Sequence, residues 1–406
     1  MKKIINTLLA FIIICTASLA YAEDNTKLEP LFPVALEHKF PDAKDTFEEV
    51  KKLILENYYS DEISEDALYW AAIEGMLRRI SPPENKELAK IWTPEEYTKI
   101  FDSLKGEQVS IGIKTSFNAG DGSLTVTEIL PGSPAENVLM QYDRILKVGS
   151  ELIKGKPVSE IGKLLDGDEG TEVTLKVNRG TEIFDVTIKR RKFETENLIV
   201  TKLSDGIALI EIKRFTEGMY EKLKAELAQL NDEKFQRLVI DLRNDPGGVF
   251  MEPLKIVEIF LPEKGILLRT FSRDKKNQNY VSTNKEPLNF DIAVLVNGNT
   301  ASSAEILAGS LRDHQKAMII GTKTYGKGVF EKTFTVKNDY RVKFITGVMY
   351  TPKGQPWQGK GLLPDFVVDQ DDKTIDAVLK LDVNERLKKD IGLITAVKLL
   401  KLQETK

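Results

Sequence analysis

Short apolar runs alternate with amphipathic helices between residues 207 and 320, and this alternation constrains the fold more than any other feature. Strands that are separated by helices form a parallel sheet with helices on both faces. The runs over 207–212, 238–242, 292–296 and 317–320 are expected to be strands, and apolar runs of this kind fit strands that are buried on both faces. Functional residues in such sheets lie just past the carboxyl ends of the strands. We therefore expect them in two loops, 244–248 and 297–303.

The rest of the chain divides by its residue pattern. One-sided helical periodicity covers residues 46–58 and 65–79, whereas residues 109–191 contain short alternating runs separated by glycines, typical of a compact β-rich domain. Apolar stripes near the C-terminus could pack on the core or pair subunits. The predicted parts are a signal peptide over 1–22, a helical N-terminal region over 23–107, a β-rich module over 108–192, an α/β core over 193–370 and C-terminal helices over 371–406.

The first residues have the features of an exported protein. Two lysines precede an apolar run over residues 8–15, and an A-x-A sequence over 20–22 fits a signal-peptidase site. An uncleaved membrane anchor is the alternative, although the run is short for a bilayer. Because Cys15 is the only cysteine, the mature chain would contain no disulfide, thiol nucleophile or cysteine metal site. We expect a periplasmic or secreted protein, and a net charge of −4 gives no reason to expect nucleic acid as a partner.

The loop over residues 297–303 offers a serine nucleophile. Ser302 directly precedes an expected helix, whose N-terminal amides could stabilise a developing oxyanion. The alternative is that Ser302 and Glu305 form a capping box that only starts the helix.

Any base for this serine is expected to be a lysine. The chain has two histidines, His38 in a polar approach and His314 just after an expected helix, where a histidine serves as a C-terminal cap. A lysine that burial keeps neutral can take the part of histidine. Lys327 lies between two glycines, 25 residues beyond Ser302. A solvated lysine in a surface turn is the alternative.

The loop over residues 244–248 could complete an oxyanion hole. The amides of Gly247 and Gly248 would form one arm, and the amide of Ser303 the other. The alternative is a plain turn after a strand, fixed by an ion pair between Asp241 and Arg243.

Four segments, in order, resemble the carboxyl-terminal processing (tail-specific) serine peptidase family. The resemblance extends over nearly the whole mature chain. It implies a crotonase-like α/β core that hydrolyses peptides through an acyl-enzyme, without metal or cofactor. It also selects Ser302 over Ser303, because the family's nucleophile lies three positions before the glutamate that matches Glu305. The segments are 238–248, 299–306, 321–328, and 350–354 together with 358–365.

The β-rich module resembles a PDZ domain in residues 109–113, 131–136 and 143–146. The resemblance implies that the backbone of Ile111, Gly112 and Ile113 binds the terminal carboxylate of a peptide that adds as a strand. A non-binding spacer of the same fold is the alternative.

The chain departs from the family at two places. Glu331 stands where the family has a glutamine that orients the lysine, and a carboxylate there would favour the protonated form of Lys327. Residues 137–143 lack the two glycines of the matching PDZ segment, so the turn before Asp143 could differ.

We interpret the chain as an exported serine endopeptidase that cleaves near the C-terminal tails of exported or unfolded proteins with a Ser302–Lys327 dyad oriented by Glu331. The fold class is an α/β crotonase-like catalytic core with an inserted PDZ-type β-rich module and a helical N-terminal region. Expected partners are polypeptides with accessible C-termini, while a homo-oligomer or an adaptor is left open. Two other interpretations stay open: a catalytically silent, PDZ-containing peptide-binding scaffold and a hydratase-like enzyme on the same core.

Overall fold

The computed structural model describes residues 34, 39–82, 85, 88–118, 120–156, 158–274 and 276–402. The predicted signal peptide, with Cys15, lies outside these residues, and so does His38. Within the described ranges, no helix combines the length and the apolar character needed to cross a membrane.

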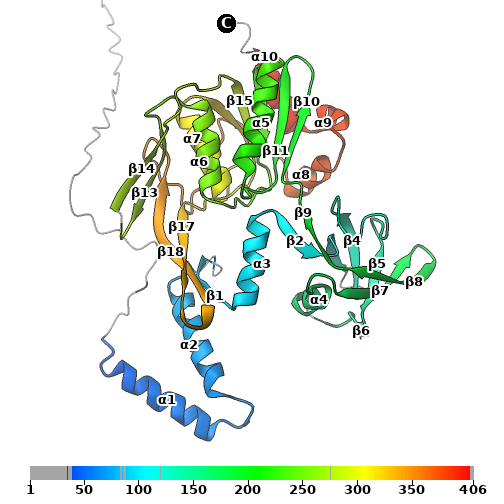
Figure 1. Cartoon of the computed structure of the whole chain (residues 1–406), viewed down its shortest axis with the longest axis vertical. Helices are drawn as coiled ribbons and strands as arrows, with labels where there is room; N and C mark the ends of the chain where they lie inside the picture. Colours follow the sequence, from blue (N-terminus) through cyan, green and yellow to red (C-terminus); the bar gives the residue numbers. More distant parts are fainter. Residues whose placement is uncertain are drawn as a thin grey trace, which may run out of the picture. The chain divides into compact units, whose positions relative to one another are not determined.

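A six-stranded sheet forms the centre of the α/β part (Figure 1). Its neighbouring strands run parallel, except that β10 is antiparallel to β11. The strands expected at 207–212, 238–242, 292–296 and 317–320 are confirmed, each to within a residue. In spatial order the strands are β10 (Leu198–Lys202), β11 (Ile207–Ile212), β12 (Arg237–Asp241), β15 (Asp291–Val296), β16 (Ala317–Gly321) and β19 (Phe366–Val367).

Helices cover both faces of this sheet, as the apolar strands predict. Ala208 and Ile210 of β11 pack with the helices α5 (Met219–Asp232), α6 (Met251–Phe260) and α7 (Ser303–Asp313). The alternate residues Ile207 and Leu209 pack with α10 (Ile391–Leu402), whose Leu393 and Leu400 are fully buried. Side chains of a strand alternate between faces, so both faces are buried. The C-terminal stripe on α10 therefore packs on the core.

A second, five-stranded sheet is absent from the sequence prediction. Its strands have mixed polar sequences without a clean apolar run, so period-two patterning does not mark them. Strand β17 follows the loop of Lys327 and pairs along its length with β18. The strands are β1 (Lys90–Trp92), β13 (Ile266–Ser272), β14 (Lys276–Val281), β17 (Val329–Thr335) and β18 (Arg341–Tyr350).

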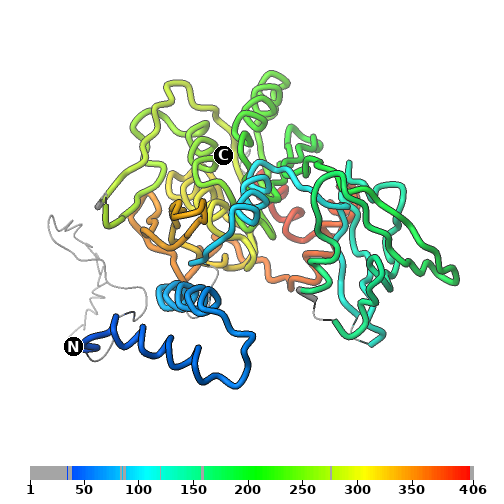
Figure 2. The backbone as a smooth tube through the Cα atoms, turned by 60° about the horizontal axis from the view of Figure 1, so that its bottom comes forward, coloured from blue at the N-terminus to red at the C-terminus, as the bar shows by residue number. Residues whose placement is uncertain are grey.

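The β-rich module has its own apolar core, which includes Val126, Ile145 and Leu175. Its sheet has the order β3-β4-β5-β7-β8, with β3 at one edge and β6 paired to β5. The chain enters through β2 and leaves through β9, which pair with each other (Figures 1 and 2). The elements are β2 (Glu107–Ser110), β3 (Ile113–Asn118), β4 (Ser123–Ile129), β5 (Arg144–Val148), β6 (Glu151–Leu152), α4 (Val158–Leu165), β7 (Glu172–Arg179), β8 (Glu182–Lys189) and β9 (Arg191–Glu194).

The turn before Asp143 does not need the missing glycine. Tyr142 itself adopts a left-handed conformation with φ 73°, which a non-glycine residue adopts at some energetic cost. Its N–H donates to the Val126 carbonyl at 2.8 Å, so the turn is tied to β4.

The remaining helices flank these sheets in the sequence. In the N-terminal region the Ser64 side chain caps the helix predicted over 65–79, by accepting from Ala67 N–H. Thr93 and Glu96 form a reciprocal capping box. The helices are α1 (Ala43–Asn57), α2 (Glu65–Arg79), α3 (Pro94–Leu104), the 3-10 turn η2 (Lys337–Asp339), α8 (Asp372–Leu379) and α9 (Val383–Lys389).

Candidate active site

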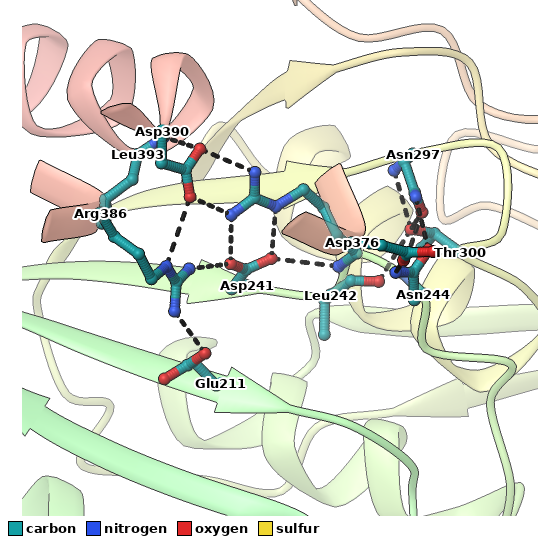
Figure 3. A network of polar contacts seen from close by, with 11 residues as sticks. Glu211, Asp241, Leu242, Asn244, Asn297, Thr300, Asp376, Arg386, Asp390 and Leu393 are labelled. Atoms are coloured by element: carbon teal, nitrogen blue, oxygen red, sulfur yellow. Dashed lines mark hydrogen bonds and ion pairs between the residues drawn. The ribbon is translucent and has the colours of Figure 1, made fainter. Parts of the chain in front are cut away.

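The two loops singled out in the sequence lie against each other at the carboxyl ends of β12 and β15. The Asn297 side chain accepts from Asn244 N–H at 2.9 Å and donates to the Asn244 side chain at 2.7 Å. Thr300 donates its hydroxyl to the Leu242 carbonyl at 2.8 Å (Figure 3). Ala301 N–H donates to the Asp245 carbonyl at 2.9 Å. These bonds fix one loop on the other, as expected where parallel strands end side by side.

Ser302 occupies a strained position between β15 and α7. Its φ of 56° and ψ of −114° are rare for a residue with a side chain. Such a conformation costs about 1–3 kcal/mol and is retained where the surrounding structure enforces it. A strained turn from a strand into a helix is also how serine nucleophiles are presented in other hydrolases. The helix begins at Ser303, so the Ser302 side chain lies at its N-terminus.

Gly247 packs directly on the serine loop. A Cβ added to Gly247 would lie 2.9 Å from the Ser302 Cβ and 2.8 Å from the Ser303 nitrogen. A Cβ on Gly248 would lie 1.9 Å from the Phe215 carbonyl oxygen. Both positions therefore require glycine: Gly247 lets the loop approach the serine, and Gly248 lets it approach the backbone of Phe215.

The amides that could hold an oxyanion can be told apart by their partners. Gly247 N–H donates to the Asp245 side chain at 2.8 Å, so it is already used. The N–H groups of Gly248 and Ser303 donate no hydrogen bond to any described residue. The Ser303 hydroxyl donates to the Gly248 carbonyl at 3.3 Å, which places these two residues in contact. Of the predicted amides, those of Gly248 and Ser303 are thus the pair left available.

Asp245 is a buried acid within the same loop. Its side chain is fully buried, and burial raises the pKa of its carboxyl well above the ordinary value. One oxygen accepts from Gly247 N–H, and the other has no hydrogen-bond partner among the described residues. Its contact with Gly247 fixes that amide away from any oxyanion.

Glu305 joins the serine segment to the lysine segment. One carboxylate oxygen accepts from Ser302 N–H at 2.9 Å and from Lys327 N–H at 2.8 Å. The other accepts from the Thr324 hydroxyl at 2.5 Å and from Gly326 N–H at 2.8 Å. Glu305 is 1% exposed. Burial raises the pKa of its carboxyl above the ordinary value, although these hydrogen bonds oppose the shift. The helix-capping alternative is therefore correct for Glu305, but the same side chain also brings the backbone of Ser302 close to that of Lys327.

Lys327 and Glu331 are in contact, as the predicted orientation requires. The Lys327 Nζ lies 3.0 Å from Glu331 Oε1. A second lysine, Lys343 of β18, has its Nζ 3.9 Å from the same oxygen. All three side chains are partly buried, so Lys327 is not the solvated surface lysine of the alternative interpretation.

A buried ionic network connects the end of β12 and the loop that follows it to the C-terminal helices. The predicted pair is present, with Arg243 Nη2 2.7 Å from Asp241 Oδ2. Asp390 accepts from Arg243 at 2.9 and 2.7 Å. Arg386 of α9 donates to Asp241 at 2.8 Å and to Glu211 at 2.5 Å (Figure 3). The C-terminal helices thus hold the strand end that leads into the glycine loop.

The predicted carboxylate-binding residues of the module have different surroundings. Ile111 is buried in the module core, and Gly112 has φ 78° with its N–H donating to the Ser110 hydroxyl at 3.0 Å. Ile113 begins β3, the edge strand of the module sheet. A Cβ on Gly112 would lie 2.0 Å from the Ser133 Cβ, so this position also requires glycine. No described group of three His, Cys, Asp or Glu side chains could hold a metal.

Four residues that the structure places in or beside this candidate site had no assigned part in it from the sequence. Glu305 was used only to set the register of the serine, Lys343 had no signal at all, and the partners Arg386 and Asp390 lie far along the chain. The pattern Ser-x-x-Glu was the available signal for Glu305. His314, in contrast, is the predicted helix cap, with no part in the site as described.

The chain is similar in sequence to known peptidases. The model of peptidase family S41 matches residues 206–368. A CtpA-like serine protease of Staphylococcus aureus (strain COL) is 35% identical over 327 residues, which are 79% of this chain and 64% of the relative. A similar protease of Staphylococcus saprophyticus is 30% identical over 81% of this chain and 66% of its own length. The matched part of the chain thus spans less than two thirds of the length of these relatives.

Solved structures share the fold. An S41 protease from Bacteroides fragilis superposes with a TM-score of 0.59 at 17% identity, over 90% of this chain and 99% of the other. The photosystem II D1 C-terminal processing protease gives a TM-score of 0.51 at 19% identity, over 84% and 98%. The family model and the curated relatives identify the chain as a member of peptidase family S41, and the solved structures share its fold.

Proposed function

We propose that the protein is a serine endopeptidase in which Ser302 is the nucleophile and Lys327 the general base. The Ser302 Oγ attacks the scissile carbonyl carbon while its proton passes to the neutral Lys327 amine. The C–N bond then breaks, and the leaving amine takes that proton from Lys327. Water, deprotonated by Lys327, hydrolyses the acyl-serine and regenerates Ser302. The amides of Gly248 and Ser303 stabilise the oxyanion in both steps. We also propose that the α/β core has a crotonase-like fold.

The observation that carries the proposal is the bridge formed by Glu305. A single buried carboxylate oxygen accepts from the backbone of both Ser302 and Lys327. A glutamate that only capped the helix would not need hydrogen bonds to the backbone of the lysine loop. Positioning of nucleophile and base on rigid elements is what a dyad needs, because small displacements cost large factors in rate.

Hydrolysis of an unfolded polypeptide with a free C-terminus tests the proposal. Ser302→Ala and Lys327→Ala are each expected to lower kcat/KM by about a thousandfold or more, since nucleophile and base act as a unit. Lys323→Ala, which removes an exposed lysine of the same loop, is the matched control and should retain activity. Tail binding without Ser302-dependent turnover would instead support the silent scaffold, and turnover that survives Ser302→Ala would exclude a serine mechanism.

The module is proposed to bind the C-terminal tails of substrates along the edge of β3. If loop amides hold the terminal carboxylate, amidation of a tail peptide removes hydrogen bonds to a charged group. The affinity should then fall by about 1.5–3 kcal/mol, the value of such bonds. Calorimetric titration of acid and amide forms of one peptide measures this difference, and equal affinities would rule out carboxylate recognition.

Export completes the proposal, on the strength of the A-x-A sequence over residues 20–22. Mass spectrometry of the protein from its native envelope fraction should find a chain that begins at Glu23. Intact residues 1–22 on most molecules would contradict cleavage.

A further inference from the structure

The carboxylate of Glu331 lies between two lysines. Its Oε1 is 3.0 Å from the Lys327 Nζ and 3.9 Å from the Lys343 Nζ. Neither contact has hydrogen-bond geometry, since this oxygen is buried with no hydrogen-bond partner among the described residues. The interaction of Glu331 with both cations is therefore mainly that of charges at short range.

Two strands and an aromatic ring fix this arrangement. Glu331 lies on β17 next to a register shift after Phe330, and Lys343 lies on the paired strand β18, opposite Thr333. The Lys343 Nζ is 5.3 Å from the ring centroid of Trp92, a residue of β1 that is 7% exposed. The ring favours the ammonium form of Lys343. The N-terminal region thus contributes to the surroundings of the proposed base.

The other charged side chains near Glu331 either contact different partners or are exposed. Lys332, next to Glu331 in β17, pairs with Asp274 at 2.6 Å. Lys90 of β1 is opposite Lys343 in register and is exposed. Further charged groups on neighbouring elements are Arg341, which lies over the Tyr97 ring, Arg269 of β13, which donates to the Pro352 carbonyl at 2.7 Å, and the buried Glu305, which accepts from Lys327 N–H.

We propose that Lys343 is a positioning residue: its charge neutralises that of Glu331, and Lys327 can then lose its proton more easily. This inference rests on the proposed Ser302–Lys327 dyad. With Lys343 present, deprotonation of Lys327 leaves a neutral Glu331–Lys343 pair. Without it, the same step leaves a partly buried carboxylate with no cation beside it. An isolated Glu331 would therefore favour the ammonium form of Lys327 more strongly than the Glu331–Lys343 pair does.

The pH–activity profile tests this charge balance. Lys343→Met should move its midpoint to higher pH by about one unit, the low end of the effect of a nearby charge. Activity at neutral pH would then fall about tenfold. Glu331→Gln should move the midpoint to lower pH, and the double variant should return close to the wild type because the removed charges cancel. If Lys343 had only a structural role, the midpoints of the variants' pH–activity profiles would not follow this order.

Control variants separate charge from packing. Lys343→Arg retains the cation and should retain the wild-type midpoint, and Lys343→Gln repeats the test if the methionine variant does not fold. Lys332→Met removes the neighbouring lysine, whose partner is Asp274, and should leave the profile in place. Superimposable profiles for the wild type and Lys343→Met would overturn the proposal.

A measurement without turnover distinguishes failure of this inference from failure of the dyad. Lysine side-chain ¹⁵N NMR in the Ser302→Ala protein follows the protonation of Lys327, assigned by the loss of its signal in Lys327→Arg. The same order of midpoints is expected. That order with no Ser302-dependent hydrolysis in the wild type would refute the dyad and keep the charge balance. An unchanged Lys327 titration in Lys343→Met would refute the charge balance alone.

Discussion

Replacement of Glu305 by alanine is expected to lower the proposed peptidase activity sharply and to destabilise the fold. The change leaves four donors without their acceptor: the N–H groups of Ser302, Gly326 and Lys327, and the Thr324 hydroxyl. Leaving a buried donor unsatisfied costs about 1–3 kcal/mol, so a loss of about 3 kcal/mol or more in the free energy of unfolding follows. Because the two loops are no longer tied, kcat/KM should fall by about a hundredfold or more.

Denaturant unfolding and steady-state kinetics of the same preparations measure these two effects. Glu258→Ala is the matched control, because Glu258 is also a helix carboxylate that accepts from a loop, through the N–H and hydroxyl of Thr283. It should reduce stability but leave kcat/KM of the folded enzyme near the wild-type value. Glu305→Gln keeps one acceptor oxygen and should fall between wild type and alanine. Full activity of Glu305→Ala would show that Glu305 does not position the site.

Removal of Asp390 is expected to cause the largest loss of stability. Arg243 and Arg386 would then stay buried with one carboxylate fewer between them. Breaking a buried pair from one side costs about 3–5 kcal/mol, because an uncompensated charge remains. Asp382→Ala removes an exposed helix cap of the neighbouring helix and should cost only about 1 kcal/mol.

A double variant separates charge balance from packing at this position. Arg386→Met combined with Asp390→Leu removes one charge of each sign, so its cost should be smaller than the sum of the two single changes. Equilibrium unfolding of the four proteins gives the coupling energy. Strictly additive effects would show that the buried charges do not depend on one another.

The buried carboxyl of Asp390 also predicts how the stability of the fold responds to acid. Burial alone would raise the pKa of Asp390, but hydrogen bonds and charge from Arg243 outweigh it and hold the pKa below the ordinary value. A carboxyl whose pKa is lower in the folded state stabilises the protein above the unfolded pKa, near 4. That contribution is lost as the pH falls through the folded pKa. Asp390→Ala should therefore differ least from the wild type in strong acid.

The sequence predicts the central sheet well because its strands and helices follow simple periods. Strands such as Ile207–Ile212 are buried on both faces and read as continuous apolar runs. The loops that hold Ser302 and Gly248 follow from the rule that sites lie at the carboxyl ends of parallel strands. The positions of these residues could thus be anticipated from local patterns together with the family's motifs.

The parts that were missed depend on contacts between distant residues. Strands β17 and β18 are mixed in polarity because they are partly buried, so no period marks them. The bonds between Arg243 and Asp390 join residues that lie 147 positions apart, and no local rule predicts such a pair. Glu331 contacts Lys327, as its predicted role requires, but the second lysine, Lys343, changes the expected electrostatics.

Covalent labelling of the serine tests the central claim most directly. A fluorophosphonate that phosphonylates activated serines is allowed to react with the wild type, Lys327→Ala and Ser302→Ala, and the modified peptide is mapped by mass spectrometry. We expect a single adduct on Ser302, formed faster as the pH rises, and its rate should fall about a thousandfold in Lys327→Ala. An adduct on Ser303, or labelling of Ser302 at the same rate without Lys327, would contradict the proposed dyad.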